Sequence, residues 1–174
     1  MQKLIRSAVA IVAVGALAAT LSANAQAQGS ASNSIQATAV VASGLAVAPL
    51  RGLDFGTVFP GLASTVVETD ATSGHLRVLG AAGSEVQVTF PSLPATLDDG
   101  GGNSMVVSFT ATHSTTDQNG TGTGFDTGTG VTTTLDGGTG QLHVYVGGTV
   151  TAADPQTAGN YSATVTLNAA YTGN

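Results

Sequence analysis

The sequence predicts an all-β protein of the sandwich class. After the first 27 residues no segment keeps a helical periodicity. Short β-branched or alternating runs recur instead, separated by clusters of Gly, Pro, Asp and Asn. The chain also contains no cysteine, so its stability must come from sheet packing or from assembly with other chains.

The N-terminus has the three parts of a secretory signal peptide. Lys3 and Arg6 precede the apolar run AVAIVAVGALAATL, and SANAQAQ then places small residues at A-x-A spacing. The run is shorter than the about 20 residues that span a membrane comfortably. Cleavage after Ala25 or Ala27 fits, and we prefer Ala27. We therefore expect a signal peptide at 1–27 and a single exported domain at 28–174, with membrane contact only during export.

The mature chain is strongly acidic. Once Lys3 and Arg6 are removed with the signal peptide, the chain contains ten Asp and Glu residues but only two cationic ones, Arg51 and Arg77. Its net charge is then −8. A chain with two cations cannot neutralise a phosphate backbone. Nucleic acid and anionic membrane surfaces are therefore excluded as partners.

Ten strands are expected in chain order, each a short run bounded by turn residues. They lie at residues 35–42, 45–50, 53–58, 64–69, 75–80, 84–90, 104–112, 131–135, 141–147 and 160–171.

The first expected strand follows a flexible, polar GSASN lead. In SIQATAVVASG every second residue is apolar, which gives one row of side chains: Ile35, Ala37, Ala39 and Val41.

The middle strands show the clearest inward faces. SEVQVTF directs Val86, Val88 and Phe90 to one side before two prolines end the run. In QLHVYVGG the residues Leu142, Val144 and Val146 point inward, which sends His143 and Tyr145 to the other face.

The Thr/Gly-rich stretch 114–130 is low in complexity and is expected to be a mobile, solvated connection. Its DQNGTGTGFDTG segment resembles the first half of a calcium loop from Asp117, but Gly128 stands where the template needs a bidentate Glu. A loop that binds no metal is therefore the better interpretation.

Catalytic constellations are missing from the sequence. His75 opens one expected strand, His113 stands at the end of a second and His143 lies on a third. Neither a nucleophile elbow nor a zinc-protease motif occurs. Asp98 and Asp99 adjoin in a Gly-rich turn, where Asp caps the turn itself. We predict that the protein is not an enzyme and requires no cofactor or metal.

The last expected strand, 160–171, leaves an edge to be covered. Only three residues follow it, yet an unpaired apolar edge promotes aggregation. The N-terminal strand 35–42 is the candidate cover. It can pair within its own chain or add to the sheet of a neighbouring copy, and periodicity alone does not decide between these.

Five stretches carry a family resemblance: LDFGTVFPG, VQVTFPS, NSMVVSF, LHVYVGGTV and TAGNYSATVTLNAAY. In this order behind a signal peptide, they resemble the bacterial domain-of-unknown-function family 4402, whose members are small secreted β proteins similar to fimbrial subunits. The last stretch is also similar to the C-terminal strand of chaperone–usher pilins and spore-coat-U-type proteins. Many of those proteins contain a disulfide, which this chain lacks.

The resemblance implies an Ig-like, pilin-like sandwich and assigns two rows of residues. The chaperone-facing row on the C-terminal edge strand would be Val165, Leu167, Ala169 and Tyr171. The donor row would be Ile35, Ala37, Ala39 and Val41. A periplasmic chaperone, an outer-membrane usher and further copies of this chain are the implied partners.

We therefore expect a non-catalytic structural subunit of a fimbria-like filament at the bacterial cell surface, reached through the periplasm. A monomeric extracellular binding module, possibly for glycans, is the alternative, with strand 35–42 paired within its own chain. A hydrolase is a third hypothesis, which would need a histidine beside a carboxylate in a cleft.

Overall fold

The computed structural model describes residues 36, 44–118 and 120–173. From residue 44 onward these belong to one compact unit, Val40–Asn174. Strands, turns and irregular segments make up all of the described chain, which confirms the all-β class. No helix there is long and apolar enough to cross a membrane. The donor row Ile35, Ala37, Ala39 and Val41 lies outside the described residues.

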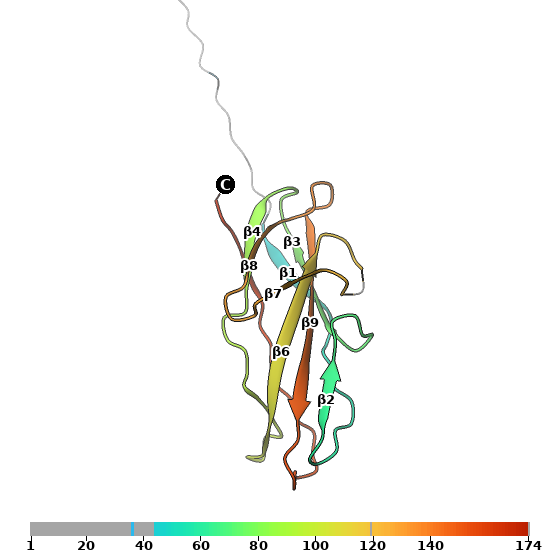
Figure 1. The fold of residues 1–174 in the computed structure, drawn as a ribbon. Coiled ribbons are helices and arrows are strands. Elements are labelled where there is room, and N and C mark those ends of the chain that lie inside the picture. Colours follow the sequence, from blue (N-terminus) through green and yellow to red (C-terminus); the bar gives the residue numbers. More distant parts are fainter. Residues whose placement is uncertain (1–35, 37–43, 119, 174) are drawn as a thin grey trace, which may run out of the picture. The chain divides into compact units, whose positions relative to one another are not determined.

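The larger sheet has seven antiparallel strands, with the order β1-β3-β9-β6-β5 and two short additions (Figure 1). Its main strands are β1 (Ala46–Arg51), β3 (Gly74–Leu79), β9 (Gln141–Thr151), β6 (Ser104–Ser114) and β5 (Thr96–Asp98). The additions are β2 (Ala63–Val66), which pairs with β9, and β7 (Thr123–Phe125), which pairs with β6. The two longest strands, β6 and β9, lie side by side at its centre.

The smaller sheet has three antiparallel strands in the order β10-β4-β8. They are β10 (Asn168–Tyr171), β4 (Glu85–Thr89) and β8 (Val131–Thr134). β10 therefore forms one edge of this sheet. The two sheets enclose a common apolar core, which is the arrangement of a β-sandwich.

The core follows the predicted alternation. Val86 and Val88 of β4 face Leu142, Val144 and Val146 of β9, and all five side chains are buried in one cluster. Between Val86 and Val88 of β4 the polar Gln87 is exposed on the other face. The period of two thus identified the buried face of both central strands correctly.

The strand boundaries differ from the prediction most clearly in three places, and in addition β9 is four residues longer and β2 ends three residues earlier than expected. The strand expected at 53–58 is wrong, because these residues have no strand neighbour among the described residues and form an irregular wall. The strand expected at 160–171 is regular only over 168–171, with one isolated bridge at Ser162. β5 and β7, with three residues each, were not predicted.

Candidate functional site

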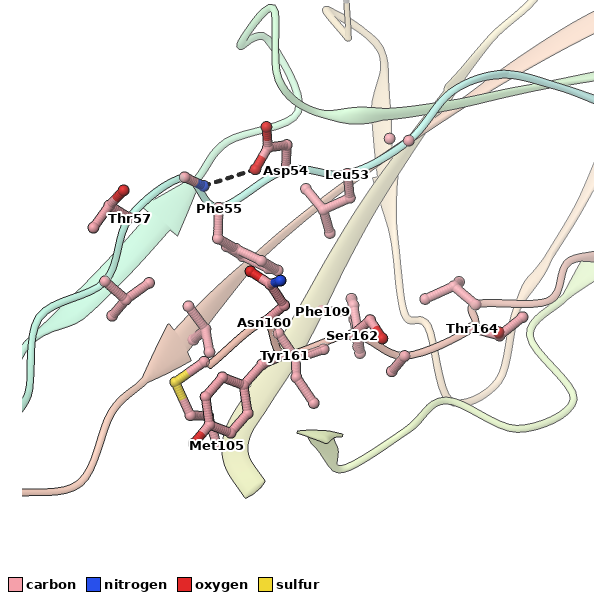
Figure 2. Close-up of a pocket in the computed structure, with 18 of the residues that line it drawn as sticks. Leu53, Asp54, Phe55, Thr57, Met105, Phe109, Asn160, Tyr161, Ser162 and Thr164 are labelled. Atoms are coloured by element: carbon pink, nitrogen blue, oxygen red, sulfur yellow. Dashed lines mark hydrogen bonds between the residues drawn. The ribbon is translucent and has the colours of Figure 1, made fainter. Parts of the chain in front are cut away.

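An open groove of about 810 Å³ lies on the inner face of the larger sheet, next to the part of that face that β10 and β4 cover. One wall is the segment 52–58 after β1, and the other is the segment 159–165 before β10. Figure 2 shows Leu53 to Thr57 along one side and Asn160 to Thr164 along the other. Inward side chains of the larger sheet form its apolar floor: Leu76, Leu97, Met105, Phe109, Val146 and Val150.

The C-terminal wall is open because its strand pairing is interrupted. Ser162 exchanges two backbone hydrogen bonds with Asp98, at 2.9 and 3.0 Å. Pairing then resumes only at Asn168, opposite Thr89. Residues 163–167 between these points belong to no strand. This stretch passes from the edge of one sheet to the edge of the other beside the groove.

The opposite wall has the side-chain alternation of a strand without a strand partner. Leu53 and Phe55 are half-buried and pack against the core, while Asp54 and Gly56 are exposed. The Asp54 amide donates to Thr72 O at 2.9 Å, on the side away from the groove. The Gly56 amide donates to the Asp54 carboxylate at 2.8 Å (Figure 2). Among the described residues, no backbone hydrogen bond joins this wall to the other.

The exposure of Ala163 marks where the core is incomplete. From Tyr161 to Tyr171 the odd-numbered side chains are at least half-buried, as the sequence predicted, with the sole exception of Ala163. Ala163 lines the groove, so its side chain faces the open space that a further strand would occupy.

The predicted C-terminal row points inward. Leu167 is buried, and its fellow members Val165, Ala169 and Tyr171 pack partly buried against the core cluster. The Tyr171 hydroxyl accepts a hydrogen bond from the Ala81 amide at 2.7 Å. A Cβ on Gly80 would lie 2.6 Å from that same oxygen, so a larger residue there would have to displace the end of the Tyr171 side chain. Tyr171 thereby ties the end of β10 to the turn after β3.

A second polar cluster lies on the outer face of the larger sheet. His143 and Tyr145 of β9 point away from the core, as predicted, and pack beside His75 of β3. His75 Nε2 lies 2.9 Å from His143 Nδ1, and the His75 ring stacks on Tyr145 with centroids 4.2 Å apart. The Tyr145 hydroxyl donates to Asp117 Oδ1.

The loop after β6 covers this cluster. Its Gly120 is buried, and Thr112 Oγ1 donates to the Gly120 carbonyl oxygen at 3.0 Å. His75, His143 and Tyr145 are therefore 6%, 5% and 0% exposed although they lie on the outer face. The expectation that 114–130 is wholly a solvated connection is thus wrong, since part of it packs on the sheet and part forms β7.

Burial sets the charge state of the cluster. Desolvation lowers the pKa of both His75 and His143, against the attraction of the Asp117 carboxylate, which raises it. Both imidazoles are therefore neutral near pH 7. Burial and the hydrogen bond to Asp117 raise the pKa of Tyr145, which keeps its hydroxyl protonated as a donor.

No pattern in the sequence indicated that His75, His143 and Asp117 would meet. Alternation placed His143 and Tyr145 on one face, but only the pairing of β3 with β9 brings His75 beside them. His113 lies elsewhere, edge-on to Phe125. Asp99, which follows Asp98 in the chain, has the predicted turn role. Its carboxylate accepts hydrogen bonds from the Gly101 and Asn103 amides at 2.7 and 3.0 Å.

Comparison with known protein families identifies the family of the chain. No curated protein matches the chain. A model of a family described as a domain of unknown function, DUF4402, matches residues 45–171. The matched range contains both walls of the groove and all strands of both sheets. The chain therefore belongs to the DUF4402 family.

Proposed function

We propose that the protein is a structural subunit of a fimbria-like filament on the bacterial cell surface. Each subunit is an Ig-like, pilin-like sandwich whose open groove accepts the N-terminal strand of a neighbouring copy. The observation that carries the proposal is the groove itself, which has an apolar floor, one wall without a strand partner and a second wall that is paired only at Ser162.

The groove has the features that strand addition requires. Main-chain groups along a wall give affinity to an added strand, and pockets for alternate side chains give it register. Here the wall 52–58 already has alternating side chains but no strand neighbour on the groove side among the described residues. Leaving such an edge open invites uncontrolled pairing, so a dedicated strand is expected to cover it.

The donor row matches a shallow, apolar floor. Ile35 and Val41 would each gain about 1.5–3 kcal/mol on full burial, and Ala37 and Ala39 less. Each main-chain hydrogen bond to a wall adds about 0.5–1.5 kcal/mol. Because Ala37 and Ala39 in the middle of the row have small side chains, the affinity of the donor strand for the groove depends on the backbone hydrogen bonds and on the larger residues at the two ends of the row.

The length of the connection favours donation between copies. The groove begins at the end of β1, where Pro49 and Arg51 line it, and the six residues of β1 span about 20 Å. Residues 42–45, which join the donor row to β1, reach at most about 14 Å. In a hairpin within one chain the donor row would lie beside β1, and the polar residues 28–34 would reach the groove. Donation to another copy has no such constraint.

Repeated donation builds a filament. One copy gives a strand and the next accepts it, so the contact is heterologous and does not close. Before assembly the half-buried members of the floor, Leu76, Leu97 and Phe109, would remain partly open to the periplasm. The resemblance to pilins implies a periplasmic chaperone that covers the floor and an outer-membrane usher that exchanges it for the donor. The proposal includes no catalytic role.

Size-exclusion chromatography with light scattering tests the proposal. Residues 28–174 should form concentration-dependent multimers that resist denaturant. Residues 43–174 should remain monomeric and unstable until a synthetic peptide of residues 28–42 restores stability. A compact monomer of 28–174 at every concentration would refute the filament and favour the monomeric binding module.

A further inference from the structure

The geometry points to a binding site for a Zn²⁺-like transition-metal ion formed by His75, His143 and Asp117. The site lies on the outer face of the larger sheet, opposite the groove, and the inference does not depend on the proposed filament. One ligand atom from each of the three residues falls within 4.8 Å of the other two.

The donor set is suited to a borderline metal ion. Two imidazole nitrogens and a carboxylate oxygen are ligands that Zn²⁺ takes in proteins, whereas Ca²⁺ and Mg²⁺ prefer oxygen alone. His75 and His143 are both buried, and their facing ring nitrogens lie in a site enclosed by β3, β9 and the covering loop. A water molecule would complete a tetrahedral sphere.

Small movements would bring the three atoms to binding distance. Two ligands of a tetrahedral Zn²⁺ ion lie about 3.3 Å apart, given bonds of about 2.0–2.1 Å. His75 Nε2 and His143 Nδ1 are 2.9 Å apart, so they need to separate only slightly. Asp117 has the larger adjustment to make, and it is an exposed residue in a loop rather than in a strand.

Neighbouring groups hold the ligands in place. Tyr145 lies opposite His75 in the strand pair, stacks on its ring and donates its hydroxyl to Asp117. It is therefore a positioning residue, since partners of this kind orient metal ligands. The three ligands come from β3, from β9 and from the loop after β6. A bound ion would fasten that loop to the sheet in a chain that has no cysteine for a disulfide.

Zn²⁺ binding to the protein expressed from the full sequence tests the inference. Equilibrium dialysis with ZnCl₂ should give one ion per chain, and Co²⁺ should show the visible absorption of a tetrahedral site. We expect H143Q to lose this binding and D117N to weaken it at least about tenfold. H113Q is the matched control, because His113 is the histidine outside the cluster, and it should bind like the wild type.

Two results would overturn the inference. One is the absence of saturable Zn²⁺ binding by the wild type, which would leave the cluster as a hydrogen-bond network only. The other is equal binding by the wild type and D117N, which would place the ion elsewhere. If H143Q does not fold, D117N still decides the question, because Asp117 is exposed and its change to Asn keeps the shape of the side chain.

Discussion

Introducing a charge at Ala163 tests whether a donor strand fills the groove. Ala163 lines the groove and is exposed, so A163D should change the free energy of unfolding of the isolated domain by no more than about 0.5 kcal/mol. When a donor strand covers the groove, the new carboxylate becomes buried without a cationic partner. Burial of this kind costs about 3 kcal/mol or more. Because 1.4 kcal/mol is a factor of ten, affinity for the donor should fall more than about hundredfold.

The matched control is T166D. Thr166 lies on the same segment and is exposed, but it does not line the groove. Both variants add one negative charge to an already acidic chain, so general repulsion affects them equally. The assay is binding of a fluorescent peptide of residues 28–42 to residues 43–174. Equal dissociation constants for A163D and T166D would show that the donor strand does not cover Ala163, and the proposed assembly would be wrong.

Three further outcomes follow from individual contacts. Y171F removes the acceptor of the Ala81 amide and should lower the free energy of unfolding by about 1–3 kcal/mol in urea titrations; an unchanged midpoint would contradict the anchoring role of Tyr171. Burial lowers the pKa of His113 below its ordinary value of 6.5, so the unfolded chain binds a proton first as pH falls. The contribution of neutral His113 to the free energy of unfolding is therefore complete above pH 6.5 and is lost below. Between pH 7.5 and 5.5, the free energy of unfolding of H113Q should fall less than that of the wild type. Burial is the main cause of the lowered pKa of His143, and the positive charge of Arg77 adds to it. The same charge repels a bound cation, so R77Q should bind Zn²⁺ severalfold more tightly in the same dialysis; weaker binding would contradict this electrostatic reasoning.

The sequence predicted buried faces well because alternation is a local property. The inward rows of β4 and β9 lie where the period of two placed them. Alternation does not reveal whether a strand has a neighbour, which explains the error at 53–58. Leu53 and Phe55 alternate inward as in a strand, yet the position beside them is the open groove.

Non-local contacts account for what the sequence missed. β5 and β7 have three residues each, too few for a periodic pattern, and they pair with opposite halves of β6. The burial of His143 was missed because alternation identifies its face but not the loop that covers that face. Asp117 stands in a low-complexity stretch, where composition indicates a solvated loop and gives no information about its contact with Tyr145.

β9 contributes to both proposed sites, and its geometry keeps them apart. Val146 and Val150 form part of the groove floor, whereas His143 and Tyr145 belong to the outer cluster. Since successive side chains of a strand point to opposite faces, a substitution in one set removes no contact from the other. D117N should therefore leave binding of the donor peptide unchanged, and A163D should leave Zn²⁺ binding unchanged. Filament assembly and metal binding can for this reason fail independently, and a loss of both in one variant would indicate that the sheet itself is disrupted.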